Sequence, residues 1–289
     1  MKLSGLCLIA SGIFLFQGEI WAQEILTVSN PARSSAIPFR LEGGALIEVE
    51  GGIGQLEGLK FIIDTGTTQS IVDRKIVDRL SLTLHPQRAL SVAGFVTVEW
   101  AELPDVHFGP ILVRNVSTMV SELAKFSELA GNADAIIGLD LLNASSRLGI
   151  FYDSKIVVLK PRDANSQRNF KRERPRCLTV EALVQGHAVR LILDTGMDGI
   201  LIYEDRIRKQ IPNLRLTDES TDAHLGQLRG KRTRLSGFRL GGRESKVEVF
   251  LMNGPREDLL PGIIGYLGTD ALKARRIELD FEGERLRWQ

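Results

Sequence analysis

The sequence predicts an all-β protein made of two similar lobes in one chain, with few short helices. The tripeptide Asp-Thr-Gly occurs at Asp64–Gly66 and again at Asp194–Gly196, so the two aspartates lie 130 residues apart (194 − 64). Each copy follows an apolar run, and an apolar pair ending in glycine comes 74 residues after each aspartate, at Gly138 and Gly268. Short β-branched runs punctuated by glycine, which are typical of all-β proteins, surround these segments. The equal spacings predict two copies of one unit.

Each unit is predicted to open with a hairpin and to close with two strands. The run Ala45–Val49 pairs with Leu59–Ile63 ahead of the first triplet, and Leu178–Val184 pairs with Ala188–Leu193 ahead of the second. We interpret the glycine-rich residues 51–54 as the first hairpin turn and not as a phosphate-binding loop, because they lie between paired strands. The second turn is expected at Gly186 and His187. The closing strands are predicted at Leu148–Tyr152, Ile156–Leu159, Ile277–Phe281 and Arg285–Trp288.

Helical patterns are few. Asp73–Leu80 and Glu204–Gln210 form a matched pair, each shortly after its triplet. A third helix is predicted over Ser121–Leu129, in the first half only. The two lobes are therefore expected over residues 37–160 and 177–289.

Residues 161–176 separate the predicted lobes and are polar and rich in arginine. We interpret them as an exposed basic linker, since almost no apolar residue is present to anchor them. A functional basic patch is the alternative.

The N-terminus predicts a signal peptide over residues 1–22. Lys2 precedes the apolar run Leu3–Phe16, and a small-residue cleavage site is expected near Ala22. The protein would then be exported, to the periplasm or out of the cell, and its mature chain would hold no stable membrane span. A retained N-terminal anchor is the alternative.

Composition excludes several classes of function. The net charge is +1, so no global basic field indicates binding to nucleic acid or to a membrane surface. Cys7 lies in the predicted signal, which leaves Cys177 alone, without a disulfide partner and expected in a buried strand. The four histidines are not at metal-ligand spacing, and no Gly-x-Ser-x-Gly elbow is present. We therefore predict no metal and no cofactor.

The two triplets carry the chemistry. Carboxylates at matching strand ends, Asp64 and Asp194, are expected to face each other. Two such groups cannot both ionise cheaply, so they share one proton. The ionised carboxylate can take a proton from a water while the neutral one donates to a carbonyl oxygen. This pair could hydrolyse an amide without a metal or a covalent intermediate.

The segments around the triplets and the later glycines resemble the retropepsin-like aspartic proteases, and more closely the bacterial aspartyl proteases with two such units in one chain. These segments are Phe61–Thr67, Ala135–Leu142, Leu191–Gly196 and Gly265–Leu272. The resemblance covers residues 37–289 apart from the linker and implies an acid protease fold with the active site between the lobes.

The resemblance implies a role for each matching residue. Asp64 and Asp194 would be the catalytic dyad. Active-site loop support would come from Thr65, Gly66, Thr67, Thr195, Gly196, Gly138 and Gly268. Each half would lend a flap over the cleft, with candidate tips at Gly94 and Gly226.

One position differs between the copies, because Thr67 follows the first triplet and Met197 follows the second. Only threonine can hydrogen-bond a carboxylate, and such a bond lowers its pKa. We therefore hypothesise that Asp64 ionises more readily and that Asp194 more often holds the proton. Asp140 and Asp270, two residues after the supporting glycines, are expected to form structural hydrogen bonds.

The sequence predicts an aspartic endopeptidase that cleaves an extended polypeptide. Because each lobe supplies one aspartate, the protein is expected to act as a monomer, an internal pseudo-dimer. Two alternatives stay open: a non-catalytic peptide-binding module on the same fold, and a narrow processing protease for one partner protein.

Overall fold

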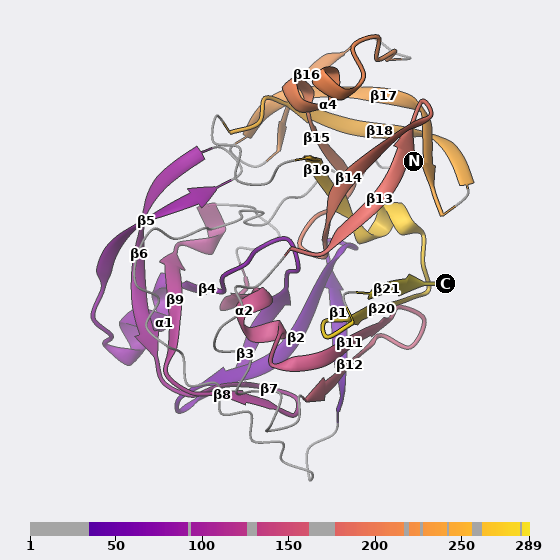
Figure 1. Cartoon of the computed structure of the whole chain (residues 1–289). Coiled ribbons are helices and arrows are strands. Elements are labelled where there is room, and N and C mark those ends of the chain that lie inside the picture. Colours follow the sequence, from indigo (N-terminus) through magenta and orange to yellow (C-terminus); the bar gives the residue numbers. More distant parts are fainter. Residues whose placement is uncertain are drawn as a thin grey trace.

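A computed structural model describes residues 35–91, 94–125, 132–161, 177–216, 220–225, 228–241, 243–255, 262–283 and 285–289. Strands dominate these residues, which confirms the predicted all-β class (Figure 1). The helices are short: α1 (Arg74–Leu80), α2 (Leu139–Leu142), α4 (Glu204–Gln210), and the 3-10 turns η1 (Leu123–Lys125) and η2 (Thr269–Leu272).

The predicted signal peptide and the predicted linker beyond residue 161 lie outside the described residues. Within the residues that are described, no helix has both the length and the apolar character needed to cross a membrane.

Seven strands of each half pair in the same order. In the first half the order is β2 (Leu46–Ile53), β3 (Leu56–Ile63), β10 (Ala135–Ile137), β4 (Ile71–Asp73), β9 (Val116–Ser121), β6 (Gly94–Leu103) and β5 (His85–Ser91). In the second half it is β13 (Thr179–Val184), β14 (His187–Asp194), β19 (Ile263–Gly268), β15 (Ile200–Tyr203), β18 (Arg243–Met252), β17 (Leu228–Leu240) and β16 (Thr221–Leu225).

The sense of each pairing is also the same in both halves. The strand before each triplet runs parallel to the strand that ends near the supporting glycine, β3 beside β10 and β14 beside β19. The short strand after each triplet is antiparallel to that same strand and parallel to the next one outward. Parallel pairing brings the ends of β3 and β10, and of β14 and β19, to one edge of their sheet. Each aspartate therefore lies beside its supporting glycine.

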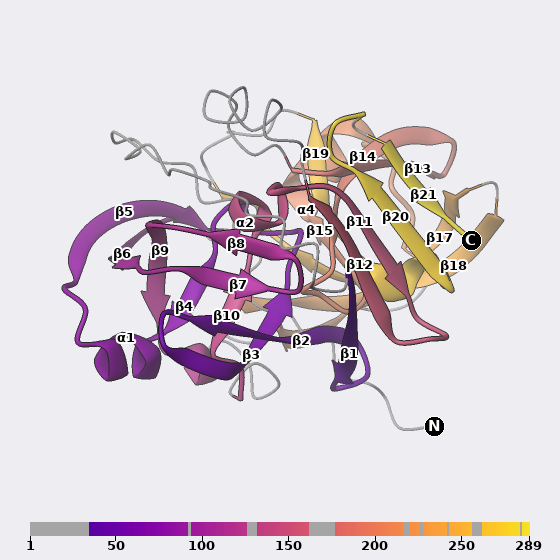
Figure 2. The same ribbon diagram turned by 90° about the horizontal axis from the view of Figure 1, so that it is seen from below.

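The last two strands of the chain join the sheet of the first half. Strand β20 (Arg276–Asp280) pairs with β11 (Ser145–Phe151), and β21 (Arg285–Trp288) extends this arrangement. Strands β12 (Ile156–Pro161) and β1 (Ala36–Glu42) continue it to β2. Figure 2 shows β21, β20, β11 and β12 side by side. Backbone hydrogen bonds thus tie the two halves together, in addition to the contacts at the triplets.

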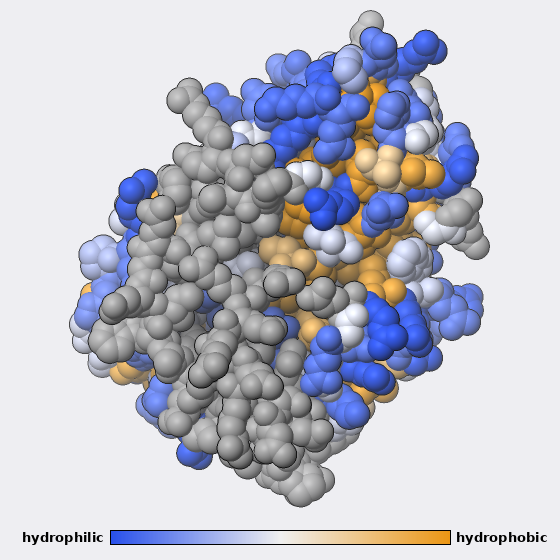
Figure 3. Space-filling view, viewed as in Figure 1, coloured by the Kyte–Doolittle hydropathy of each residue, from blue (hydrophilic) through white to orange (hydrophobic). Residues whose placement is uncertain are grey.

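A short ribbon covers the far end of the first hairpin. It consists of β7 (Val106–Phe108), which pairs with β2, and β8 (Ile111–Val113), which pairs with β7. Outer strand β17 has alternating exposed cations, and Figure 3 shows the hydrophilic surface of this region at the top of the molecule.

Two predicted turns are shifted by side-chain packing. The first hairpin turns at Gly54 and Gln55, so Gly51 and Gly52 lie within β2. A Cβ on Gly51 would lie 2.3 Å from the Phe61 ring, which makes glycine necessary for packing rather than for turning. In the second hairpin His187 is not in the turn, because it opens β14 and pairs with Val184.

The predicted helix over Ser121–Leu129 is wrong where the structure describes it. Strand β9 continues to Ser121, and only Leu123–Lys125 form a 3-10 turn, while residues 126–130 lie outside the described residues. The backbone N–H of Leu123 donates to the Asp73 carboxylate at 2.8 Å, a long-range bond that periodicity does not reveal.

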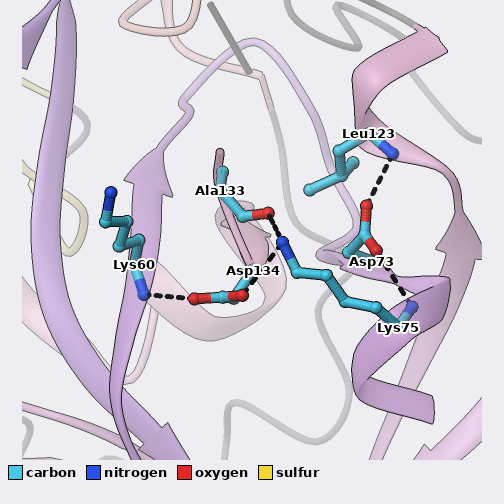
Figure 4. A network of polar contacts seen from close by, with 6 residues as sticks. All are labelled: Lys60, Asp73, Lys75, Leu123, Ala133 and Asp134. Atoms are coloured by element: carbon cyan, nitrogen blue, oxygen red, sulfur yellow. Dashed lines mark hydrogen bonds and ion pairs between the residues drawn. The ribbon is translucent and has the colours of Figure 1, made fainter. Parts of the chain in front are cut away.

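That carboxylate belongs to a polar network around the start of α1 (Figure 4). Asp73 caps the helix by accepting a hydrogen bond from the Lys75 backbone N–H at 2.9 Å. The Lys75 ammonium contacts Asp134 at 3.1 Å, and Asp134 also accepts from the backbone N–H of Lys60 at 2.8 Å. The network joins β3, α1 and the segment before β10, which are the elements around the first triplet.

One hydrophobic core extends through both halves. Its residues at the joint include Ile150 of β11 and Ile277 of β20, which are paired and fully buried. Apolar burial of this kind is the main favourable contribution to folding.

Truncating Ile277 tests the contribution of this joint. Ile277→Ala should lower the free energy of unfolding by about 2–5 kcal/mol, because it leaves a cavity where the halves meet. Urea unfolding followed by circular dichroism measures the change. Val96→Ala, at a side chain 39% exposed, is the matched control and should shift stability by less than about 0.5 kcal/mol. Equal effects of the two variants would contradict a shared core.

Candidate active site

The two triplets meet at the centre of the molecule. Asp64 directly follows β3, and Asp194 is the last residue of β14. Both carboxyl groups are fully buried. The backbone N–H of Asp64 donates to the carbonyl of Ile137 at 3.0 Å, which fixes the first aspartate against the strand that leads to Gly138.

The threonines of the triplets hydrogen-bond reciprocally between the halves. The Thr65 hydroxyl donates to the Leu193 carbonyl at 2.8 Å, and the Thr195 hydroxyl donates to the Ile63 carbonyl at 2.7 Å. Each hydroxyl also accepts from the backbone N–H of the other threonine, at 3.0 and 3.2 Å. All four bonds are buried and involve residues 128–132 positions apart, so they set the relative position of the two loops.

The glycines of the triplets allow each loop to touch the opposite carboxyl group. A Cβ on Gly66 would lie 2.3 Å from the Asp194 carboxyl carbon, and a Cβ on Gly196 would lie 2.5 Å from that of Asp64. Neither contact is tolerable for a larger residue. Each aspartate also accepts a hydrogen bond at 2.7 Å from the N–H of the glycine in its own triplet. The two carboxyl groups are therefore adjacent and held from both sides.

Burial controls the protonation of this pair. It raises the pKa of Asp64 well above the usual aspartate range, and the neighbouring Asp194 charge and carboxyl raise it further. Hydrogen bonds from the backbone of Gly66 and Thr67 act in the opposite direction but are smaller. One carboxyl oxygen of Asp64, Oδ2, has no hydrogen-bond partner among the described residues. The pair can therefore hold a proton and still offer an acceptor oxygen.

The expected hydrogen bond from Thr67 to a carboxylate is not formed. The Thr67 hydroxyl donates instead to the backbone carbonyl of Gln69 at 2.9 Å. A hydroxyl donates only one hydrogen bond, so this contact excludes donation to Asp64. Met197, its counterpart, is buried in a small apolar cluster with Ile192 and Tyr266. The hypothesis that Asp64 ionises more readily thus loses the contact on which it rested.

The supporting glycines contact the loops that follow the triplets. Gly138 N–H donates to the Ser70 hydroxyl at 2.9 Å, and the next residue, Leu139, donates to the Thr67 carbonyl at 3.0 Å. In the second half Gly268 N–H donates to the Gly199 carbonyl at 2.7 Å. A Cβ on Gly138 would lie 2.7 Å from the Gln69 carbonyl carbon, so this close approach requires glycine.

The two aspartates after these glycines accept hydrogen bonds from the same loops. Asp140 accepts from the backbone N–H of Ser70 at 3.0 Å and from its hydroxyl at 2.7 Å. Burial raises the pKa of Asp140 to about 6, against the lowering effect of the Ser70 bonds. Asp270 accepts from the Gly199 N–H at 2.8 Å. Sequence reasoning missed Ser70; aligning the two halves with an offset of 130 residues would have shown that it corresponds to Ile200.

The flap candidates are only partly described. Gly94 begins β6 and pairs with Ser91, so it lies at the end of the β5–β6 hairpin. Gly226 lies outside the described residues, between β16 and β17. The flap assignment stays a prediction.

Cys177 lies just before β13 and is half-buried, and so it is not the buried strand residue that the sequence predicts. Burial raises the pKa of its thiol to about 12, and the Asp194 charge adds to this effect. The thiol therefore stays protonated at neutral pH and is a poor nucleophile.

Comparison with known proteins agrees with this geometry. Residues 48–141 match the family model described as aspartyl protease, and the predicted resemblance is confirmed for that stretch. No curated protein matches the chain. Among solved structures, a retropepsin-like aspartic protease from Rickettsia conorii is 17% identical, with a TM-score of 0.31; the match covers 43% of this chain and 86% of that one.

Removing one threonine hydroxyl tests the link between the loops. Thr195→Val keeps the shape but leaves the Ile63 carbonyl and the Thr65 N–H without their buried partner. We expect a loss of about 2–4 kcal/mol in the free energy of unfolding, measured in urea. Thr221→Val is the control, because the Thr221 hydroxyl is exposed and its bond to the Arg232 carbonyl is 3.5 Å long. A Thr195→Val protein as stable as this control would contradict the proposed link.

Proposed function

We propose that this chain, whose first half matches the aspartyl protease family, is an aspartic endopeptidase with Asp64 and Asp194 as its catalytic dyad. The observation that carries the proposal is the pair of adjacent, buried carboxyl groups, each packed against the glycine of the opposite triplet. A purely structural role does not account for two buried carboxyl groups side by side, because burying acids together is costly unless they share a proton.

The dyad would act by acid–base catalysis. The ionised carboxylate would take a proton from a water as that water attacks the carbonyl carbon of a peptide bond. The neutral carboxyl would donate its proton to the carbonyl oxygen, so negative charge does not build up there. Collapse of the tetrahedral intermediate would then release the amine with a proton from the dyad. The unpartnered Asp64 Oδ2 is an oxygen that can accept from the attacking water.

The substrate of this dyad would be an extended polypeptide. Strands surround the dyad on both sides, and a strand-like peptide can pair with such elements through its main chain. Because one chain supplies both aspartates, a monomer would be sufficient for activity. The matching strand order of the halves supports our inference that they are copies of one unit. We also propose export, on the N-terminal sequence alone.

Neutralising either aspartate tests the dyad. Asp64→Asn and Asp194→Asn should each lower kcat/KM by at least about 1,000-fold, since both proton transfers need a carboxyl group. The measurement is cleavage of a peptide library by the mature protein, with products mapped by mass spectrometry and with pepstatin as a probe. Asp105→Asn, at an aspartate about half exposed in a surface ion pair, is the matched control and should keep full activity.

The same assay separates the alternatives. Binding of peptides without cleavage at any pH from about 3 to 8 would favour the non-catalytic module and refute the peptidase. Cleavage of one folded protein with no cleavage of unfolded ones would favour a narrow processing enzyme.

The raised pKa of Asp64 predicts the alkaline limit of activity. The dyad works with one proton, and burial beside Asp194 holds that proton above the usual aspartate range. Activity should therefore fall as the pH rises through this elevated pKa, because both carboxyls are then ionised. The pH dependence of kcat/KM measures this limit. A rate that fails to decline at alkaline pH, with the protein still folded, would contradict a shared proton.

A further inference from the structure

The second active-site loop is held differently from the first. In the first half the Ser70 hydroxyl links the loop to its support, since it donates to Asp140 and accepts from Gly138 N–H. At the corresponding place in the second half is Ile200, which is buried and has no hydroxyl. The second loop therefore lacks this polar link.

A carboxyl pair occupies that region instead. Asp198 lies four residues after Asp194, and its carboxyl is hydrogen-bonded to that of Asp270, whose Oδ1 accepts from the Gly199 N–H at 2.8 Å. The same Oδ1 would lie 2.7 Å from a Cβ on Gly268, so it is packed against the supporting strand end. The residue corresponding to Asp198 in the first half is Thr68, which has no carboxyl group.

We propose that Asp198 and Asp270 share a proton and, by doing so, hold the second active-site loop in place as positioning residues. A hydrogen bond between two carboxyls exists only while one of them is protonated. With the proton present, Asp270 bridges Asp198 and the Gly199 N–H and joins the loop to η2. Without it, two negative charges on the same loop and its support repel each other. This proposal rests on the proposed function only for its effect on activity.

The environment of the pair favours the shared proton. Partial burial raises the pKa of Asp198 to about 7, and the hydrogen bond and charge of Asp270 raise it further. Asp270 itself is exposed, so protons can exchange with solvent while the protein stays folded. In the described part of the chain, neither carboxyl forms an ion pair with a Lys, Arg or His.

One further titratable group faces the pair. Tyr152, from the turn after β11, donates a hydrogen bond to the Thr269 hydroxyl at 2.9 Å. Burial raises the pKa of Tyr152, and the charge of Asp270 raises it further. The phenol is therefore neutral throughout the range in which Asp198 titrates.

The sign of the effect on stability follows from the direction of the shift. The pKa of Asp198 is higher in the folded chain than in the unfolded chain, so folding is favoured while the folded state keeps a proton that the unfolded state has lost. This stabilisation is fully present below the unfolded pKa, near 4, and is lost as the pH rises through about 7. Loosening of the second loop over that interval would add an alkaline decline in activity to that of the dyad.

Asp198→Asn tests the shared proton. The amide keeps a hydrogen bond to Asp270 but does not titrate, so it mimics the protonated pair. From pH 5 to pH 8 the thermal midpoint of the wild type should fall relative to that of the variant by about 3 °C or more. The variant should keep the wild-type rate at pH 5 within about threefold and lose less activity by pH 8. Asp105→Asn, at a surface aspartate, should follow the wild type in both measurements.

Parallel midpoints of wild type and Asp198→Asn across this range would overturn the proposal, whether or not the protein cleaves peptides. A second measurement covers the case in which the variant does not fold. The Asp198 side-chain carboxyl carbon of the wild type, followed by NMR, should titrate near pH 7. A midpoint near 4, the value of an ordinary aspartate, would also overturn the shared proton. Loss of cleavage by the wild type with an intact NMR titration would refute the peptidase alone.

Discussion

The reciprocal hydrogen bonds of Thr65 and Thr195 are the constraint on which the rest of the arrangement depends. Each hydroxyl uses both of its functions, as a donor to a carbonyl at the end of the opposite strand and as an acceptor from the opposite threonine. This geometry requires β3 and β14 to end at the same place, and it requires a residue without a Cβ after each threonine. The pairing of β20 with β11 supplies the second fixed contact between the halves. Together they make the position of each aspartate a property of both halves.

Much of this framework could be predicted from the sequence because it depends on main-chain pattern. Equal spacing predicted the parallel partners of the triplets, and the matched helix patterns reappear as α1 and α4. The errors have a different origin. Gly51 is needed for contact with Phe61 and not for a turn, and the Thr67 hydroxyl binds a carbonyl in its own loop. Such choices depend on neighbours distant in sequence or on loop geometry, which residue spacing does not report.

The halves also show how one backbone arrangement accepts different polar supports. Seven strands pair in the same order and sense, yet the link below the first loop uses Ser70 and the link below the second uses Asp198 and Asp270. A serine hydroxyl serves as donor and acceptor at every pH near neutrality, whereas a carboxyl pair does so only with a proton. The two loops carry equivalent aspartates but need not respond equally to pH. Symmetry of the fold thus does not imply symmetry of the dyad.

The complete burial of Asp64 and Asp194 limits how the dyad can be charged. An isolated buried carboxylate would be costly, and two would be more so. Each loop offsets part of this cost with its own glycine N–H, which donates to Oδ1 at 2.7 Å. These donors stabilise one negative charge without removing the repulsion that a second would bring, so the singly protonated pair is favoured. The loops that bring the carboxyls together therefore also select the charge state that acid–base chemistry needs, and any loosening of either loop would weaken both effects.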